Sequence, residues 1–241
     1  MAKAKGRSRL DRAQIVETAL RLLNEVGLEG LTLRRVATEL NVQAPALYWH
    51  VKHKQQLLDE MATVMLREMS APEGGGDGDG DGGSGGSGDV GAGEPDAGED
   101  WREVLAGTGR GLRRALLRYR DGAKVFAGTR LTDAGHAARQ EEYLRRMVAA
   151  GFAPGAAARA AFVVFAFTEG FVIEQQAVEP MPGERDPGYD VAARTEAFGP
   201  RYPLAAQAGE ELFGDFDARF EEGLAAVVAG IAATFGPAER D

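Results

Sequence analysis

Three polar-tipped aromatic residues stand in a row at Tyr48, Trp49 and His50. Successive residues of a helix point in different directions, so one core-facing side cannot take all three rings. Their hydroxyl, indole N–H and imidazole groups suit a wet surface lined with phosphates, where each can make a hydrogen bond. We therefore expect this row to contact nucleic acid. For Trp49, packing against the first helix of the chain is the alternative.

The residues around this row predict two short helices joined by a tight turn. Thr32 can cap the first helix, because its hydroxyl accepts an early backbone N–H. Asn41 tolerates the left-handed conformation in which helices end. Pro45 suits the first turn of the second helix, expected over about 44–50, where a missing N–H breaks no hydrogen bond. Two helices joined in this way form a helix-turn-helix.

Long polar side chains flank the predicted turn and can reach DNA. Arg34 and Gln43 are long enough to hydrogen-bond the edges of bases. The other expected contacts suit the phosphate backbone or the rim of a groove: Thr32, Pro45, Tyr48, Trp49, His50 and Lys54. These residues predict double-stranded DNA as the partner.

The formal charge of the chain is divided unevenly between its two ends. The whole chain carries −9, but residues 1–56 hold ten Lys and Arg against five Asp and Glu, a net of +5, which leaves −14 on the rest. Such asymmetry indicates a polyanion at one end only. The basic residues before Leu10 form either a solvated, disordered tail or an arm on the phosphates or in a minor groove, and both interpretations stay open.

The sequence offers little for catalysis, metal binding or membrane insertion. There is no Cys, and of three His residues only His136 lies outside the predicted DNA-binding segment. A catalytic site needs a nucleophile, a base and an orienting group, so we expect no enzyme activity, no metal site and no cofactor. No apolar segment follows the basic start, and the longest apolar run, near 160–167, is too short to cross a bilayer. We expect a soluble, cytoplasmic protein.

Apolar periodicity predicts an all-α fold. Asp11 and Gln14 form a predicted capping box at the start of the first helix, and Gly27 and Gly30 are predicted to end it. Asp121 is predicted to cap a short helix. The expected helices, besides the helix-turn-helix, cover 11–26, 52–69, 100–119, 121–127, 132–150, 154–178, 204–212 and 215–235.

Two segments stand apart from this pattern. Residues 71–99 are rich in Gly, Asp and Ser, which predicts a disordered insert, and the calcium-loop match that opens at Asp77 fails because the closing position is Gly88. The last helix, 215–235, is instead apolar on almost every side. A helix of that kind must be buried on most sides, which favours a partner subunit.

Several segments resemble the tetracycline-repressor (TetR) family. The segments A-L-R-L-L-N-E-V-G-L-E-G-L-T at 19–32 and P-A-L-Y-W-H-V-K-H-K at 45–54, together with L-D-R at Leu10, resemble its DNA-binding domain. The segments R-D-G-A-K-V-F-A-G-T-R at 120–130 and E-G-F-V-I-E at 169–174 resemble the effector domain of the tetracycline-repressor branch. Only the insert and the loop after Val178 fall outside the resemblance.

This resemblance implies a three-helix helix-turn-helix head and a helical effector domain that forms a four-helix bundle across a homodimer. It implies a transcriptional repressor that binds a palindromic operator and is released by a small-molecule effector, with control of an efflux or resistance gene. The domains would be a DNA-binding domain over 1–56, a connecting helix over 57–70, the insert over 71–99, and a ligand-binding and dimerisation domain over 100–241. Gln43-Ala44 replaces the usual Glu-Gln of the branch, so a different operator is expected.

The resemblance also implies an effector site with several departures. Thr129, Arg130 and Glu174 match residues that the branch uses around its drug and magnesium. Phe126 replaces the magnesium-binding His, so magnesium should be dispensable. Phe162, Phe165 and Phe167 add to an apolar, aromatic lining, which suits a flat ligand such as an aromatic polyketide or a drug-like compound. The remaining matched positions, where the branch has His, Asn, Phe and Gln, are Ser70, Thr108, Leu112 and Tyr143.

Two alternatives stay open. Each aromatic ring of this site, taken alone, is better interpreted as core. The second domain could also serve dimerisation only, which would make the chain a constitutive repressor or an architectural DNA-binding protein without an effector.

Overall fold

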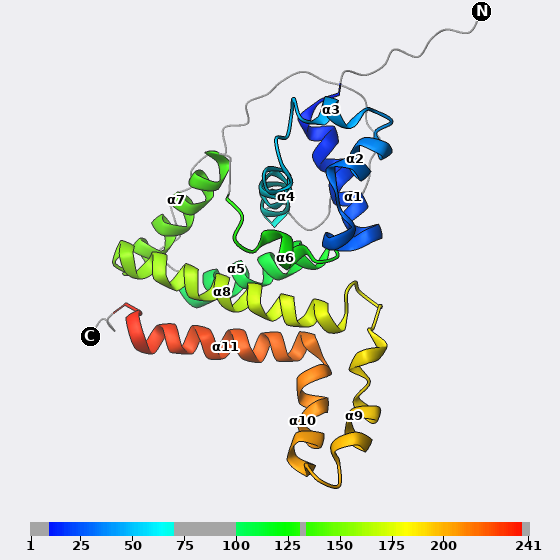
Figure 1. Cartoon of the computed structure of the whole chain (residues 1–241). Coiled ribbons are helices and arrows are strands. Elements are labelled where there is room, and N and C mark those ends of the chain that lie inside the picture. The colour runs from blue at the N-terminus through cyan, green and yellow to red at the C-terminus, as the bar shows by residue number, and fades with distance from the viewer. Residues whose placement is uncertain (1–9, 70–99, 131–133, 238–241) are drawn as a thin grey trace, which may run out of the picture.

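The computed structural model describes residues 10–69, 100–130 and 134–237 (Figure 1). Within these ranges the chain is helical and has no strand, which confirms the predicted all-α fold. The predicted insert, Ser70 and the basic residues before Leu10 lie outside the described residues. The elements are α1 (Arg12–Gly30), α2 (Leu33–Glu39), α3 (Ala44–Leu47), α4 (Lys54–Met69), α5 (Trp101–Leu117), α6 (Gly122–Phe126), α7 (Ala134–Ala149), α8 (Pro154–Val178), the 3-10 turn η1 (Pro187–Tyr189), α9 (Val191–Phe198), α10 (Pro203–Phe213) and α11 (Phe216–Phe235).

Capping residues set the first two helix starts as predicted. The Gln14 N–H donates to Asp11 Oδ1 at 2.8 Å, and the Asp11 N–H donates to the Gln14 side chain at 3.4 Å, which completes the capping box. Thr32 Oγ1 accepts from the Arg35 N–H at 3.2 Å and so caps α2. Asn41 has the predicted left-handed backbone, with φ 52°.

Two helix ends differ from the prediction. α1 is interrupted at Gly27 as predicted, because this residue takes a positive φ of 67°, but one further turn follows the kink and the helix ends at Gly30 instead of at residue 26. The reading helix is also shorter than expected. α3 covers Ala44–Leu47, and residues 48–50 form a turn after it, so the three rings lie on that turn.

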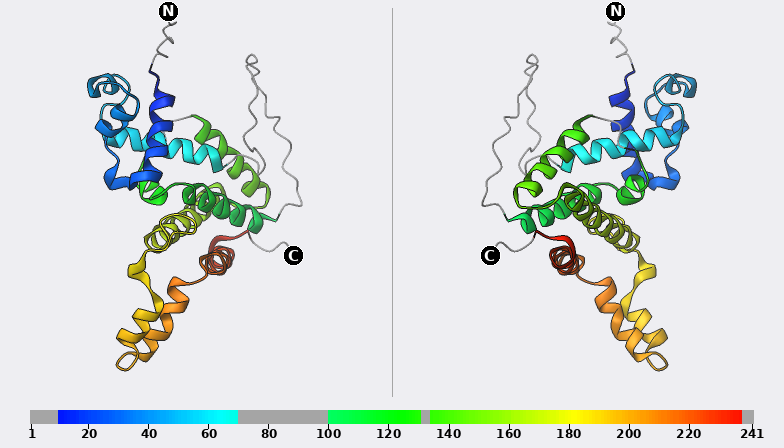
Figure 2. Two further views of the ribbon diagram at one scale, coloured as in Figure 1. Left: turned by 90° about the vertical axis from the view of Figure 1, so that its right-hand side faces the viewer. Right: turned by 90° about the vertical axis from the view of Figure 1, so that its left-hand side faces the viewer.

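The elements form a head, a helical body and a projecting hairpin (Figures 1 and 2). α1, α2 and α3 lie at one end of the molecule, and α4 leads from them into the body. In the body α8 packs against α5, α7 and α11. α8 begins at Pro154 and ends at Val178, as the sequence predicts.

Three apolar clusters hold these elements together. The head core gathers α1 to α4 around residues such as Leu23 and Met61, and it also takes Val125 from α6. A second cluster lies between α5, α7, α8 and α11 and includes Phe220. The third, which we name the effector cluster, lies between α4, α5, α6 and α8 and comprises Ala62, Leu66, Leu112, Leu116, Ala123, Phe126 and Val172, with Phe165 and Ile173 packed on it.

The loop after Val178 holds more structure than its prolines suggest. We predicted one helix over 204–212, but the structure has two, α9 and α10, which form the projecting hairpin (Figure 2). Asp190 caps α9 by accepting from the Ala193 N–H at 2.6 Å. This capping signal was missed among the surrounding prolines.

α8 is the one helix of the described chain that is long and apolar enough to cross a membrane by length and composition. At 25 residues, α8 is longer than the apolar run near 160–167, which we expected to be too short to cross a bilayer. Core helices of soluble proteins share this property. Here α8 carries Glu169 and Glu174 and packs against four other helices, α5, α6, α7 and α11.

Candidate DNA-binding surface and effector cluster

The row of rings lies on the surface of the head. The exposed fractions are 89% for Trp49 and 54% for Tyr48, while His50 is half-buried. This exposure rules out the alternative that Trp49 packs against the first helix. The rings owe their position to Leu47, which is fully buried beneath the turn. An exposed Trp without a core contact is free to meet a partner.

The remaining predicted DNA contacts surround this row. Arg34, Gln43 and Pro45 are exposed on α2 and α3, and Gln43 is the cap residue of α3. Thr32 is exposed, although its hydroxyl already caps α2. Lys54 is half-buried, and its Nζ donates to the Leu28 carbonyl at 2.7 Å. Lys54 therefore also ties α4 to the end of α1, a role that the sequence did not indicate.

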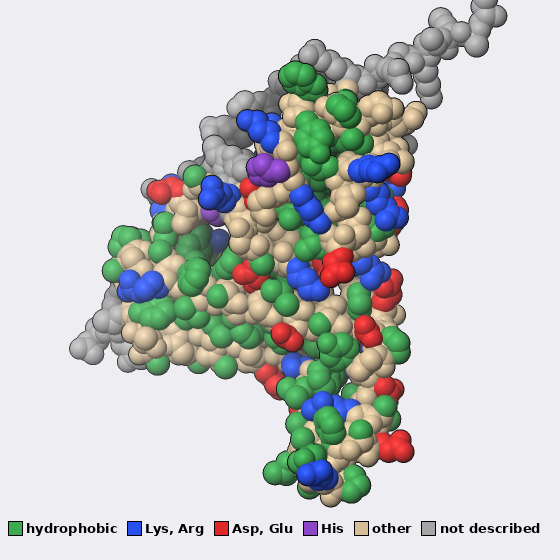
Figure 3. Space-filling model, viewed as in Figure 1, with side chains coloured by type: hydrophobic (Ala, Val, Ile, Leu, Met, Phe, Trp, Pro, Cys, Tyr) green, Lys and Arg blue, Asp and Glu red, His purple; other side chains and the backbone are tan. Residues whose placement is uncertain are grey.

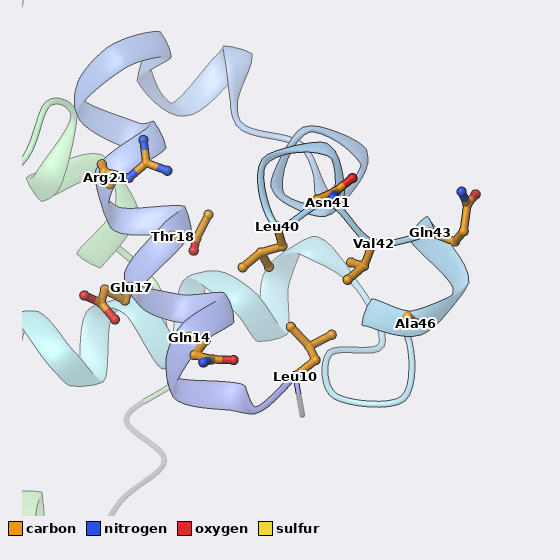
Figure 4. A pocket seen from close by; sticks show the side chains of 10 residues that line it. All are labelled: Leu10, Gln14, Glu17, Thr18, Arg21, Leu40, Asn41, Val42, Gln43 and Ala46. Atoms are coloured by element: carbon orange, nitrogen blue, oxygen red, sulfur yellow. The ribbon is translucent and has the colours of Figure 1, made fainter. Parts of the chain in front are cut away.

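A groove of about 1020 Å³ runs along the head between α1 and the turn from α2 to α3 (Figure 4). Figure 4 shows Leu10, Leu40 and Val42 in the space between α1 and the turn from α2 to α3, with Gln43 pointing away from α1. This hollow separates the turn from α1 and lies away from the effector cluster. Its lining is Leu10, Gln14, Glu17, Thr18, Arg21, Leu40, Asn41, Val42, Gln43 and Ala46.

Part of the predicted effector site does come together. Leu112, Phe126 and Phe165 meet in the effector cluster, where the ring centroids of the two Phe residues are 5.6 Å apart. Leu112 and Phe126 are only 3% and 4% exposed. The cluster is therefore packed closed, and a ligand could enter only by parting these side chains.

Other predicted effector residues lie elsewhere. Tyr143 packs on the second cluster, where its hydroxyl donates to the Ala157 carbonyl at 3.1 Å, and burial raises its pKa. Phe167 also belongs to that cluster and stacks on Phe220, and Phe162 is 68% exposed. Glu174 is exposed on the face of α8 that points away from the cluster.

The loop after α6 and the second turn of α5 hold the remaining predicted residues. Thr108 is half-buried one turn before Leu112, and its hydroxyl donates to the Val104 carbonyl at 2.8 Å. Thr129 Oγ1 donates to the Phe126 carbonyl at 2.7 Å. The Arg130 N–H donates to Asp59 Oδ1 of α4 at 3.1 Å. The loop that follows Phe126 is thus fastened to the helix that leaves the head.

α6, like α4, joins the head to the effector cluster. Val125 packs in the head core, and Phe126, the next residue, packs in the effector cluster. We predicted that Asp121 caps α6, but this is wrong: Asp121 has φ 54° and makes no capping bond. Its carboxylate instead accepts from the Leu28 N–H of α1 at 3.0 Å.

The contact between α6 and the head is strengthened by the charge of Asp121. Burial alone would raise the pKa of Asp121, but the Leu28 N–H and Lys124, whose Nζ lies 2.9 Å away, hold it below its ordinary value. Asn24 of α1 adds a second link, because its Oδ1 accepts from the Arg120 N–H at 2.9 Å. Sequence reasoning missed Asn24 as a functional position, since polar residues near the end of a helix give no long-range signal.

α8 reaches the same joint through a buried amide. Gln176 is 3% exposed; its Oε1 accepts from the Ala123 N–H at 3.2 Å, and its Nε2 donates to the Tyr119 carbonyl at 2.7 Å. A buried amide with both ends bonded fixes the corner between α5 and α6 against α8. A shift of α8 or α6 therefore also moves Asp121 and Arg120, which bond α1 of the head.

The donor set at the effector cluster does not fit a magnesium ion. Phe126 offers no ligand atom at the matched position, and within the described residues no group of three or more His, Asp or Glu side chains could hold a metal. Magnesium prefers several oxygen ligands in a near-octahedral arrangement. No step in the action of this protein is therefore assigned to a metal.

An exposed helix-turn-helix coupled through α4 and α6 to a helical body is typical of a one-component regulator of transcription. The family model described as "Bacterial regulatory proteins, tetR family" matches residues 15–61, and that described as "Tetracyclin repressor-like, C-terminal domain" matches residues 94–235. The chain belongs to the TetR family of transcriptional repressors, and its relatives are regulators rather than enzymes.

Relatives and solved structures support this assignment along most of the chain. The tetracycline repressor protein class C of Escherichia coli is 40% identical over 93% of this chain and 91% of its own length. A TetR variant from Acinetobacter baumannii AYE in complex with minocycline has a TM-score of 0.65 and 33% identity, covering 95% of this chain and 99% of that one. ActR of Streptomyces coelicolor in complex with actinorhodin has a TM-score of 0.71 and 25% identity, covering 94% and 98%.

Proposed function

We propose that this chain is a cytoplasmic, homodimeric repressor that leaves a palindromic operator when a mostly apolar, aromatic effector binds. Residues 1–56 act as the DNA head, 57–70 as the connecting helix, and 100–241 as the effector and dimerisation domain, while 71–99 form an insert. The regulated gene encodes efflux of, or resistance to, the effector. The named tetracycline repressors and the minocycline and actinorhodin complexes among its relatives support this class of ligand.

Homodimerisation is supported by an uncovered apolar face. Figure 3 shows hydrophobic side chains gathered over α8 and α11. On α8, Phe162 and Val163 are 68% and 38% exposed, and on α11 Ala226 and Ala229 are exposed too. A second copy of the same two helices would cover these residues and form a four-helix bundle.

The observation that carries the proposal is the double role of α6. Its consecutive residues Val125 and Phe126 pack into the head core and into the effector cluster. A ligand that parts Phe126 from Phe165 displaces α6, and with it the contacts that Val125 and Asp121 make with the head. Release follows if the ligand favours a head separation that no longer fits two successive major grooves, roughly 34–36 Å apart.

The predicted anchors divide between the two copies of the dimer. Thr129 follows α6 in the same chain as the cluster, whereas Glu174 lies on the face of α8 that the second copy covers. We assign Glu174 to the effector site of the partner subunit. Phe126 supplies no metal ligand, so effector binding requires no magnesium.

The test is an operator-release titration. Operator DNA recovered by footprinting upstream of the gene is titrated with minocycline and with actinorhodin, each with and without EDTA, on the wild type and Glu174→Ala. We expect release that survives EDTA and needs more compound in the variant. Strict dependence on magnesium contradicts the metal-free site, and unchanged release by Glu174→Ala removes that residue from it.

The alternative function is a DNA-binding repressor without an effector, which the closed packing of Leu112 and Phe126 favours. A thermal-shift screen of aromatic compounds separates the two, because a ligand that binds only the native state raises the melting temperature. A protein that footprints its operator but responds to no compound in binding or release is the constitutive repressor.

A further inference from the structure

A carboxylate of α8 beside the effector cluster lacks a partner within the described chain. Glu169 is half-buried, and its Oε1 is shielded from solvent without a hydrogen-bond donor. Asp121 is shielded to a similar degree, yet it accepts from the Leu28 N–H and from Lys124. Buried carboxylates are normally satisfied in this way, so an unsatisfied one calls for an explanation.

The neighbours of Glu169 on α8 belong to the effector cluster. Phe165 lies one turn before it and Ile173 one turn after, and residues four apart on a helix share a face. Phe165 contacts Phe126 with ring centroids 5.6 Å apart, and Ile173 packs on the same cluster. The Glu169 carboxylate therefore stands between two side chains that border the site where the ligand enters.

The protein gains no stability from this arrangement. Burial raises the pKa of Glu169 because the charged form loses water and receives no donor in return. A neutral or apolar residue at this position would be more favourable for the ligand-free fold. Groups that destabilise a fold are typical of binding sites, where a ligand supplies the missing partner.

We propose that Glu169 is the recognition carboxylate of the effector site and that it selects flat aromatic compounds carrying a protonated nitrogen, on an amine or in the ring. This rests on the proposed function, because the cluster must open for a ligand. A protonated nitrogen donates to the unpaired Oε1, and the rings of Phe126 and Phe165 provide faces on which a delocalised cation can rest. Glu174 is exposed and does not border the cluster of its own chain.

Matched three-ring probes test the charge preference. 9-Aminoacridine is protonated at neutral pH, whereas acridone has almost the same shape and no charge. Binding is measured without DNA, by probe fluorescence and by thermal shift, because aminoacridines intercalate into duplexes. We expect the wild type to bind 9-aminoacridine about tenfold or more tightly than acridone, which is the effect of one charge-assisted hydrogen bond.

Three variants locate the preference. Glu169→Gln keeps the size of the side chain and should lower the affinity for 9-aminoacridine to that for acridone, with acridone unchanged. Glu169→Leu should do the same, and both should raise the melting temperature of the ligand-free protein by roughly 2 °C or more. Glu196→Gln, at an exposed position of α9, is the control and should keep the wild-type preference.

The outcomes separate this inference from the proposed function. Equal binding of both probes by the wild type, or a preference that persists in Glu169→Gln, overturns the role of Glu169 and leaves the effector site standing. Loss of acridone binding in both Glu169 variants also overturns it, because Glu169 would then be structural. If neither probe binds the wild type, the inference fails, and the release titration with minocycline and actinorhodin then decides the proposed function by itself.

Discussion

At the scale of single residues, the head carries the long polar side chains and exposed rings that we expect to contact DNA. Arg34 is exposed on α2, and Lys54 is half-buried and bonded to the Leu28 carbonyl. Arg34 reaches outward without a structural role in the head, whereas Lys54 serves both the fold and the proposed interface. The two residues should therefore fail in different ways when truncated.

We predict that Arg34→Ala relaxes sequence preference while Lys54→Ala weakens binding to all sequences. Loss of a base contact reduces the discrimination between right and wrong bases by about 1–3 kcal/mol. Loss of a phosphate contact instead lowers the slope of log affinity against log salt concentration by about one. Lys54→Ala should also destabilise the fold by about 1 kcal/mol, since the Leu28 carbonyl loses its donor. Anisotropy titrations at several salt concentrations measure both. If Lys54→Ala is less stable but its DNA affinity depends on salt as in the wild type, Lys54 has a structural role only.

Trp49 is the clearest surface anchor of the head. Because it is 89% exposed, Trp49→Ala should change the free energy of unfolding by less than about 0.5 kcal/mol. Operator affinity should fall about tenfold or more, since an exposed ring gains most from a partner surface. Val148→Ala, at a 43% exposed position of α7, is the control and should leave affinity unchanged. A drop in melting temperature comparable to a core mutation would show that Trp49 supports the fold.

At the scale of elements, the Asp121 carboxylate is one of the groups that hold α6 against α1. Asp121 accepts from the Leu28 N–H with a pKa held below its ordinary value, and its backbone is left-handed. Asn is the variant of choice, because it tolerates this conformation and removes only the charge. Asp121→Asn should lower the free energy of unfolding by about 1 kcal/mol at neutral pH.

The pH dependence of that loss is fixed by the direction of the shift. A carboxyl whose pKa is lower in the folded state stabilises the protein above its unfolded pKa of about 4 and ceases to do so as pH falls through the folded value. The difference between wild type and Asp121→Asn should therefore be largest near pH 7 and vanish in acid. Melting curves of both proteins over this range give the measurement. A difference that grows towards acid contradicts a charged Asp121.

Packing between α5, α8 and α11 depends on a glycine. A Cβ on Gly109 would lie 3.0 Å from Leu224 Cδ1 and 3.2 Å from Val164 Cγ1, whereas a Cβ on Gly107 would meet no described atom within 4 Å. Gly109→Ala should destabilise by about 1–3 kcal/mol through overpacking. Gly107→Ala should stabilise by about 0.5–1 kcal/mol through helix propensity. Denaturant unfolding compares the two, and equal effects would show that the helices can move apart freely.

At the scale of the whole molecule, the proposed dimer, and with it the proposed binding to a palindrome, depends on the apolar face of α8 and α11. Phe162 is 68% exposed, and a Cβ on Gly170 or Gly230 would meet no described atom within 4 Å, so a second backbone can approach closely. Two heads held by one bundle give the fixed separation that successive major grooves require.

We predict that a charge on this face separates the two copies. Ala226→Glu and Phe162→Glu should each convert the dimer to monomer at micromolar concentration, because a carboxylate would be buried without a partner. Operator binding should fall in parallel, while helical content remains. Light scattering after gel filtration measures the mass, and Val148→Glu on α7 serves as the control. Variants that stay dimeric would place the interface elsewhere.

The sequence by itself determined most of the helices and the helix-turn-helix of this protein. Caps and breakers act within a few residues, so Asp11, Thr32, Asn41 and Pro154 could be interpreted without knowing the fold. The segments around α3 and α6 also carried the family resemblance, because each is contiguous in the chain. The same reasoning failed where a group distant in sequence binds the capping residue. The Asp121 carboxylate accepts from the Leu28 N–H and therefore makes no capping bond in α6.

Only the tertiary structure decided which side chains share a site. Tyr143 packs on the second cluster, Glu174 faces away from the effector cluster, and Glu169 lies beside the effector cluster. Apolar periodicity does not show which of these three residues belongs to the effector site. The reason is that the face a helix turns to each neighbour depends on how α5, α6, α7 and α8 cross, and that angle is set by interlocking side chains far apart in sequence. Local propensity carries no information about such contacts.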